Sequence, residues 1–141
     1  MKTVLFVCTG NTCRSPMAAC LFNDLARRSG QKARALSAGI GAVDGLPASQ
    51  GARRAMARRG LSLEGHASQE LTEDLLQKAD LVVGMTDRHV ALVRAMGAKS
   101  PLYAFDDPPI TDPYGGGDDV YEQAARDIQR QLPALMQQLE S

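Results

Sequence analysis

The chain has 141 residues, of which 44% are hydrophobic and 23% charged, and its 16 basic side chains balance its 16 acidic ones. Compact domains most often have about 100–150 residues, so residues 1–141 are expected to form a single domain with its own core. The balanced charge and the lack of any apolar run near the 18 or so residues of a membrane helix exclude nucleic acid and membranes as expected partners.

The first predicted unit is a strand, a loop and a helix. Residues 1–8, with the apolar run Val4-Leu5-Phe6-Val7, are typical of a strand buried on both faces. Ser15 is expected to cap a helix whose first position is Pro16 and whose end is marked by Gly30.

The middle of the chain continues this alternation. Residues 33–37 are a weaker strand candidate, and the glycine-rich residues 39–51 predict a loop. A helix is expected at about residues 48–59, and helical signals resume at Thr72. Residues 79–85 again have the pattern of a buried strand.

In the last third, Asp87 is expected to cap a helix, and residues 101–105 are the last strand candidate. Residues 106–119 carry three prolines, three glycines and five aspartates, and structureless loops of that length tend to be functional. The amphipathic helix that follows contains Pro133, which predicts a kink or a restart near Arg130.

Strands that alternate with helices predict an α/β domain in which helices flank a parallel sheet in three layers. In such a sheet ligands bind at the carboxyl ends of the strands. The loop after the first strand lies at such an end, so it is the expected binding site.

This loop, residues 8–15, reads Cys-Thr-Gly-Asn-Thr-Cys-Arg-Ser and is suited to hold a phosphate. Gly10 permits a tight path, and a loop that runs into a helix N-terminus directs several N–H groups at one anion. These groups and Arg14 favour the thiolate form of Cys8, while Arg14 can grip two phosphoryl oxygens. A thiolate beneath a bound phosphate can attack phosphorus and form a covalent thiophosphate.

The leaving group of such a reaction needs a proton, and Asp112 in the long acidic loop is the candidate general acid. It would later act as the base on the water that hydrolyses the intermediate. Composition alone does not select it, because Asp106, Asp107, Asp118 and Asp119 are nearby.

The pattern Cys-x5-Arg-Ser after an N-terminal strand, with Asp112-Pro113-Tyr114 far along the chain, resembles the low-molecular-weight protein tyrosine phosphatases over essentially the whole sequence. The resemblance implies a four-stranded parallel sheet and neither metal nor cofactor. It also implies Cys8 as nucleophile, Arg14 as phosphate clamp and Asp112 as general acid. The other residues expected at the phosphate and substrate are Thr9, Gly10, Asn11, Thr12, Cys13, Ser15 and Tyr114.

Three of these residues have implied roles of their own. Asn11 would hold the loop in shape, and Ser15 would donate a hydrogen bond to the Cys8 sulfur. Cys13 matches the second loop cysteine, which in relatives can form a reversible disulfide with the nucleophile under oxidation.

The substrate prediction depends on Thr12. Most tyrosine-specific relatives carry a bulky aliphatic residue there, whereas the protein-arginine phosphatases of the family carry threonine in the same loop as this chain. A hydroxyl can hydrogen-bond a guanidino group, while a butyl-sized side chain favours an apolar ring. We therefore expect hydrolysis of phosphoarginine in proteins by a cytoplasmic monomer, with phosphotyrosine as the alternative substrate.

Two other functions fit the sequence less well than that of a phosphatase. An arsenate reductase relays a disulfide through later cysteines, and no cysteine follows Cys20 here. A phosphate-binding module without turnover is disfavoured, because Cys8, Arg14 and Asp112 are all present.

Residues outside the motif receive less specific roles. Cys20 is expected in core packing, His66 and His89 at structural or exposed positions, and Tyr114 in the pocket wall. The arginines of the second helix are expected to form a solvated face; they are Arg53, Arg54, Arg58 and Arg59.

Overall fold

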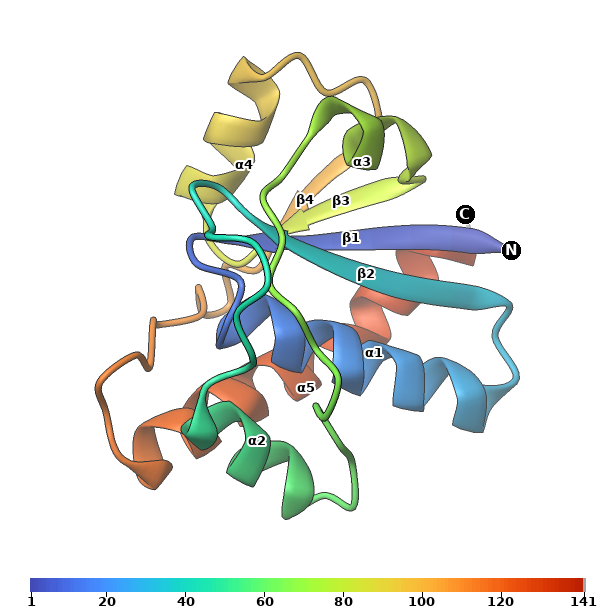
Figure 1. The fold of residues 1–141 in the computed structure, drawn as a ribbon. Coiled ribbons are helices and arrows are strands. Elements are labelled where there is room, and N and C mark those ends of the chain that lie inside the picture. Colours follow the sequence, from blue (N-terminus) through green and yellow to red (C-terminus); the bar gives the residue numbers. More distant parts are fainter. Residues whose placement is uncertain (141) are drawn as a thin grey trace.

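A computed structural model of the protein describes residues 1–140, which form a three-layered α/β fold around a parallel sheet (Figure 1). Its strands are β1 (Lys2–Cys8), β2 (Ala33–Gly39), β3 (Leu81–Gly84) and β4 (Leu102–Ala104), in the order β2-β1-β3-β4. All neighbouring strands pair in parallel, which confirms the expected four-stranded sheet. The candidate strand at 33–37 extends to Gly39 because β2 pairs with β1 as far as Cys8.

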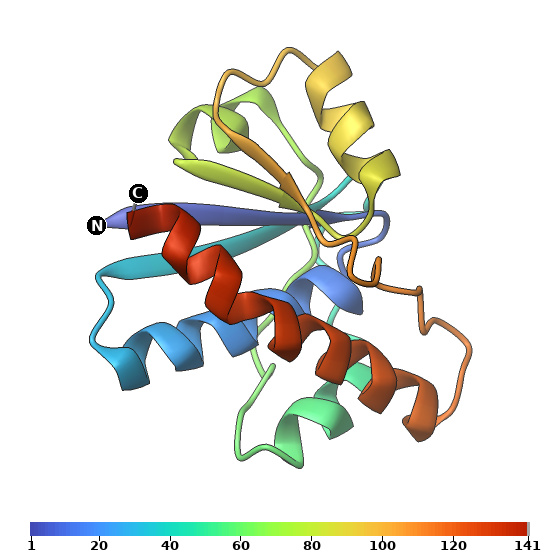
Figure 2. The same cartoon turned by 180° about the vertical axis from the view of Figure 1, so that it is seen from behind.

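The helices cover the two faces of the sheet unequally (Figures 1 and 2). One face is covered by α1 (Arg14–Ser29), α2 (Gln50–Ala57) and α5 (Asp118–Glu140), and the other by α3 (Glu73–Lys78) and α4 (Asp87–Ala95). Alternate side chains of β1 enter the two cores: Phe6 lies on the α1 side, and Leu5 lies on the opposite side. Within residues 1–140 no helix is long and apolar enough to cross a membrane.

The outer edge of β2 is bonded to side chains from neighbouring segments. The Asn23 amide accepts the N–H of Ala35 at 2.8 Å and donates to its carbonyl at 3.3 Å. Farther along, the Gln69 amide donates to the carbonyl of Ser37 at 2.9 Å. Gly39, at the end of the strand, accepts the backbone N–H of Leu71 at 2.9 Å.

Two helices begin one or two residues earlier in the chain than predicted. The N-cap of α1 is Cys13, so the predicted cap at Ser15 is wrong; the Ser15 hydroxyl instead lies beside the Cys8 sulfur. The N-cap of α4 is Thr86, whose hydroxyl accepts a backbone N–H in the first turn. Asp87 follows it within that turn, where a carboxylate is favoured by the helix dipole.

The helix α5 runs unbroken through Pro133, so the predicted restart near Arg130 is wrong. Pro133 stands on the exposed side of the helix, whereas its neighbours Leu132 and Leu135 are buried. On an exposed face water can replace the hydrogen bond that proline removes. Burial of the apolar face therefore keeps the helix continuous.

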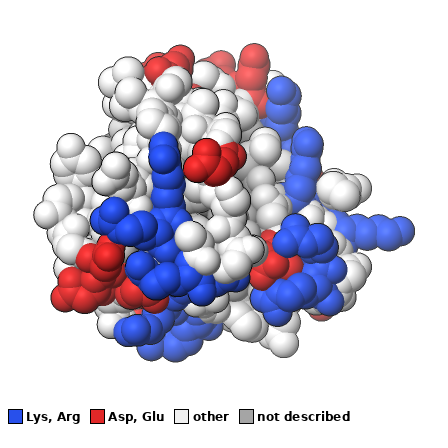
Figure 3. Space-filling view, turned by 60° about the horizontal axis from the view of Figure 1, so that its bottom comes forward, with Lys and Arg blue, Asp and Glu red and all other residues white. Residues whose placement is uncertain are grey.

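Arginines in α2 and directly after it bind the start of α5, so three of the four predicted to form a solvated face also take part in ion pairs. Arg54 Nε lies 2.9 Å from Asp118 Oδ1, Arg58 Nε 2.7 Å from Glu122 Oε1, and Arg59 Nη1 2.9 Å from the same oxygen. Figure 3 shows basic side chains gathered on this side of the molecule with acidic ones among them. The pairs fix the start of α5, directly after the acidic loop.

Glu122 should make the stability of the fold depend on pH. Its hydrogen bond with Arg59 chiefly lowers its pKa from 4.5 to about 2. A carboxylate whose pKa is lowered by folding stabilises the protein above its unfolded pKa and stops doing so as the pH falls through the folded one. Glu122→Gln should therefore lower the free energy of unfolding at pH 7 by about 1–2 kcal/mol, allowing for screening at the surface, and by much less near pH 2.

Urea unfolding at several pH values measures this difference. Glu64→Gln, which alters an exposed carboxylate, is the matched control and should leave stability unchanged at every pH. Equal stability of wild type and Glu122→Gln at pH 7 would show that the ion pairs of Glu122 with Arg58 and Arg59 do not contribute to the free energy of unfolding.

Candidate active site

The loop of residues 8–15 follows β1 at the carboxyl edge of the sheet and leads directly into α1. With two residues of the loop after β4 it lines a cavity of about 200 Å³. The structure thus brings together nearly all the residues predicted from sequence: Cys8, Thr9, Gly10, Asn11, Thr12, Cys13, Arg14, Asp112 and Tyr114. Ser15 is buried behind them.

Cys8 lies at the end of β1 with only 2% of its surface exposed. Its sulfur is 2.8 Å from the Ser15 hydroxyl oxygen and accepts the backbone N–H of Asn11 at 3.3 Å. The Asn11 N–H, the Ser15 hydroxyl and the nearby start of α1 thus surround the sulfur with polar groups. The geometry agrees with the predicted contact between Ser15 and the Cys8 sulfur.

Asn11 holds a backbone conformation that few side chains other than glycine adopt, with φ of 58°. Its fully buried amide donates to the hydroxyls of Ser15 at 2.8 Å and Ser37 at 2.9 Å, and accepts the N–H of Gln69 at 2.9 Å. A left-handed residue costs about 1–3 kcal/mol and persists only where its surroundings enforce it; the three hydrogen bonds of the buried Asn11 amide do so here. They set the curvature of the loop.

Sequence reasoning missed the residues that support the loop from behind. The Nε2 atom of His66 lies 2.8 Å from the carbonyl oxygen of Asn11 and, since a carbonyl only accepts, donates to it. Ser37 and Gln69 bond to the Asn11 side chain, as described above. Their positions, at the end of β2 and in the segment before α3, carry no motif that would have revealed this role.

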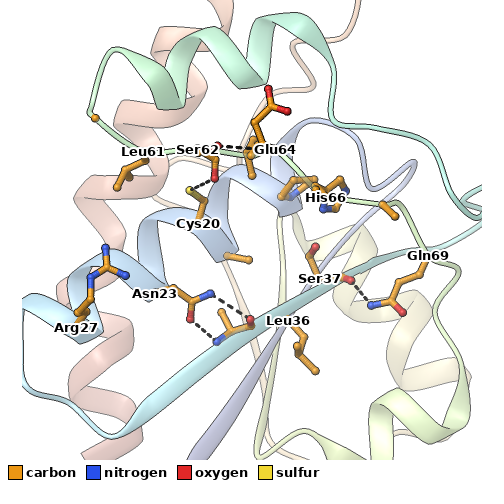
Figure 4. Close-up of a pocket in the computed structure, with 17 residues that line it drawn as sticks. Cys20, Asn23, Arg27, Leu36, Ser37, Leu61, Ser62, Glu64, His66 and Gln69 are labelled. Atoms are coloured by element: carbon orange, nitrogen blue, oxygen red, sulfur yellow. Dashed lines mark hydrogen bonds between the residues drawn. The ribbon is translucent and has the colours of Figure 1, made fainter.

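The supporting residues border a second cavity of about 650 Å³, shown in Figure 4 with His66, Ser37 and Gln69 along one side. It is also lined by Cys20. This residue packs against the main core, as predicted, but it is only half-buried. The thiol of Cys20 donates to the Ser62 carbonyl at 3.8 Å, and burial raises its pKa. A protonated thiol without an anion-binding loop does not suit attack on phosphorus, so this larger cavity is not the candidate active site.

Arg14 joins the phosphate loop to the loop after β4. Its buried guanidinium donates from Nη1 to the carbonyl of Ile110 at 3.0 Å, and Nη2 lies 3.8 Å from Asp112 Oδ2. The carbonyl contact fixes the orientation of the planar group at the cavity, where bidentate binding of an oxyanion is possible.

Of the five aspartates that the sequence left open, the structure places Asp112 at the cavity. Asp118 is bound to Arg54 instead, and Asp107 contacts α5 through its backbone. The Asp112 carboxylate is 55% exposed and accepts the backbone N–H of Tyr114 at 3.1 Å. It can therefore exchange protons with water while facing the phosphate loop.

Two more predicted residues line the cavity and differ in burial. Tyr114 is 76% exposed, and its role as a pocket wall stays a prediction. The buried thiol of Cys13 lies 3.3 Å from the Ser49 hydroxyl and 3.4 Å from that of Tyr121, whose own pKa is raised by burial. Cys8 and Cys13 are both free thiols, and their oxidative pairing stays a prediction.

Taken together, the fold and the cavity define a class of protein: an α/β domain whose first strand ends in a cysteine at a loop suited to bind an anion, beside a buried arginine. The profile of the family "Low molecular weight phosphotyrosine protein phosphatase" matches residues 3–141. The chain belongs to this family, as its motifs predicted, and is a protein phosphatase.

Individual relatives are similar over nearly their whole length. The chain is 35% identical to a protein-arginine-phosphatase of Bacillus subtilis, covering 96% of this chain and 95% of that one. It is 37% identical to EpsP of Ralstonia nicotianae, named a probable low molecular weight protein-tyrosine-phosphatase, covering 95% and 93%. A structure of the YwlE arginine phosphatase superposes with a TM-score of 0.91 at 33% identity, covering 99% and 96%; it is a cysteine-to-serine mutant with a phosphorylated active-site serine.

Proposed function

We propose that the protein is a protein-arginine phosphatase that works through a thiophosphoryl-cysteine intermediate. The observation that carries the substrate assignment is that Thr12, a residue with a hydroxyl, is among those that line the phosphate cavity. The similarity to a protein-arginine-phosphatase of Bacillus subtilis over almost the full length supports it.

The first half-reaction uses three residues. The loop N–H groups and Arg14 hold the phosphoryl oxygens, and the Cys8 sulfur attacks phosphorus from below. The bond from phosphorus to the arginine nitrogen breaks as the sulfur–phosphorus bond forms. Asp112 delivers its proton to that nitrogen, and arginine leaves as a neutral or cationic guanidine group rather than as an anion.

The second half-reaction restores the enzyme. A water molecule attacks the phosphorus of the intermediate, and Asp112 takes one of its protons. The sulfur–phosphorus bond breaks, inorganic phosphate is formed, and Cys8 returns as a thiolate. The phosphorylated serine named for the cysteine-to-serine mutant of YwlE supports a covalent intermediate on the residue corresponding to Cys8.

The substrate class follows from the polarity of the cavity wall. A phosphoarginine side chain presents several N–H donors, and Thr12 and Asp112 supply oxygen acceptors at the cavity. Phosphotyrosine is the second candidate, because Tyr114 at the rim could stack against its ring and because a relative such as EpsP is named a probable tyrosine phosphatase.

Replacing Thr12 with isoleucine should switch this preference. The wild type should show a higher kcat/KM on phosphoarginine peptides than on phosphotyrosine peptides of the same sequence. Thr12→Ile should lower the phosphoarginine value by about 10–100-fold, because a donor of the substrate loses its partner, and should leave the phosphotyrosine value unchanged or raised.

Thr12→Ser retains the hydroxyl and is the matched control; it should keep the wild-type preference. A wild type that prefers phosphotyrosine, with a ratio that Thr12→Ile does not move, would contradict the phosphoarginine assignment and leave the phosphatase chemistry standing.

A further inference from the structure

His89 lies in the first turn of α4, only 4% exposed, and connects that helix to the phosphate loop. Its Nδ1 atom is 2.8 Å from the hydroxyl oxygen of Thr86, and its Nε2 atom is 3.0 Å from the hydroxyl oxygen of Thr9. Thr9 follows Cys8 directly and lines the cavity. Three side chains thus form a continuous hydrogen-bonded chain from the cap of α4 to the candidate active site.

The protonation state of His89 determines which atom donates in each of these two hydrogen bonds. Burial and the positive charges of Arg14 and Arg88, opposed in part by Asp112, lower its pKa to about 4. The ring is therefore neutral near pH 7, with one nitrogen as donor and the other as acceptor.

Thr86 indicates which nitrogen carries the proton. Its hydroxyl oxygen accepts the backbone N–H of His89 at 3.4 Å, while its hydrogen can be donated to Nδ1. Nε2 then carries the ring proton and donates it to Thr9. The other tautomer would leave the hydrogen of the half-buried Thr86 hydroxyl with no acceptor among the described residues, so that only water could accept it.

The consequence appears at the cavity. A Thr9 oxygen that accepts a hydrogen bond from His89 keeps its own hydrogen for a different partner, and phosphoryl oxygens are acceptors only. We propose that His89 is a positioning residue that fixes the Thr9 hydroxyl as a hydrogen-bond donor to the phosphoryl group during its transfer to Cys8. The inference rests on the phosphatase chemistry proposed above.

A purely structural histidine would fill the same space and cap the same helix, so the experiment has to measure coupling to Thr9. Thr9→Val removes the hydroxyl at nearly constant volume, and His89→Leu removes both ring nitrogens. The activity to measure is kcat/KM on p-nitrophenyl phosphate, whose small leaving group limits specific contacts to the phosphate. The same measurement on His89→Gln tests whether an amide N–H near the position of Nε2 rescues part of the activity.

When Thr9 is present, His89→Leu should lower kcat/KM by about 10–100-fold, the range expected when a charged group loses one hydrogen-bond donor. In the Thr9→Val background the same change should cost less than about twofold, because residues that act through one contact are not additive. Equal losses in both backgrounds would overturn the role of His89. A wild-type turnover that does not depend on Cys8 would instead overturn the proposed chemistry.

A second experiment, ¹⁵N NMR of the histidine rings, uses the wild-type protein and does not depend on the folding of a variant. The chain has two histidines, so the ring ¹⁵N resonances of His89 can be assigned against those of His66. Protonation at Nε2 and a neutral ring at pH 6 are expected. A ring protonated at Nδ1, or a cationic ring at that pH, would overturn the inference.

Discussion

Cys8→Ser should lower the kcat of the protein by roughly 10⁴- to 10⁶-fold, the usual scale for loss of a covalent nucleophile. A serine hydroxyl is a far weaker nucleophile than a thiolate, and the groups of residues 1–140 that are hydrogen-bonded to the Cys8 sulfur are the Ser15 hydroxyl and the Asn11 N–H, neither of which is a base. The oxygen can keep the contact with Ser15, so the fold should survive. Steady-state kinetics and thermal unfolding of the same samples measure both effects.

Cys20→Ser is the matched control, because it alters a thiol in the other cavity and should leave kcat within about twofold. Rapid acid or base quenching of the wild type during turnover, followed by peptide mass analysis, should find one phosphoryl group on the peptide that contains Cys8. Turnover by Cys8→Ser near the wild-type rate would exclude the covalent mechanism.

Asp112→Asn should have the second largest effect, a loss of about 10²–10³-fold in kcat on phosphoarginine peptides. The amide cannot give a proton to the departing nitrogen or take one from water. On p-nitrophenyl phosphate the first step needs little acid assistance, while the second still lacks its base. The variant should therefore release about one equivalent of p-nitrophenol in a burst and then turn over slowly.

Asp106→Asn, in the same acidic loop but outside the cavity, is the appropriate control and should behave as wild type. A loss that is equal for both leaving groups, without a burst, would contradict the double role of Asp112. Full activity of Asp112→Asn would return the assignment to the other aspartates of the loop.

The parts of the fold that sequence predicted are those fixed by local chemistry. The apolar run at Val4–Val7 has one stable environment, a strand buried on both faces, and Gly30 adopts the left-handed conformation that ends α1. The predicted cap at Ser15 is wrong because serine suits a helix cap locally, whereas the folded loop brings its hydroxyl to the Cys8 sulfur. Competition between a local and a distant partner is not visible in a sequence window.

The residues of the candidate site, too, could be predicted only where a local sequence motif identifies them. The loop motif indicates Cys8 and Arg14 from their spacing. Asp112 is selected only through the family resemblance, because composition offers five aspartates and the choice among them depends on which one faces the cavity. His66 and His89 were assigned generic roles because their partners, Asn11 and Thr9, lie far away in sequence. Contacts across such separations arise from strand order and helix packing, which no short motif encodes.

The bonds along the outer edge of β2 also bear on how molecules of this protein meet one another. An unpaired strand edge invites a strand from a second chain, which is a common start of aggregation. Here a strand from a second molecule would have to displace the Asn23 amide from the N–H and carbonyl of Ala35. It would also have to displace the Gln69 amide from the carbonyl of Ser37. The opposite edge is the three-residue β4, too short to offer a long template. The parallel sheet that carries the catalytic loop is thus closed to growth by strand addition at either side.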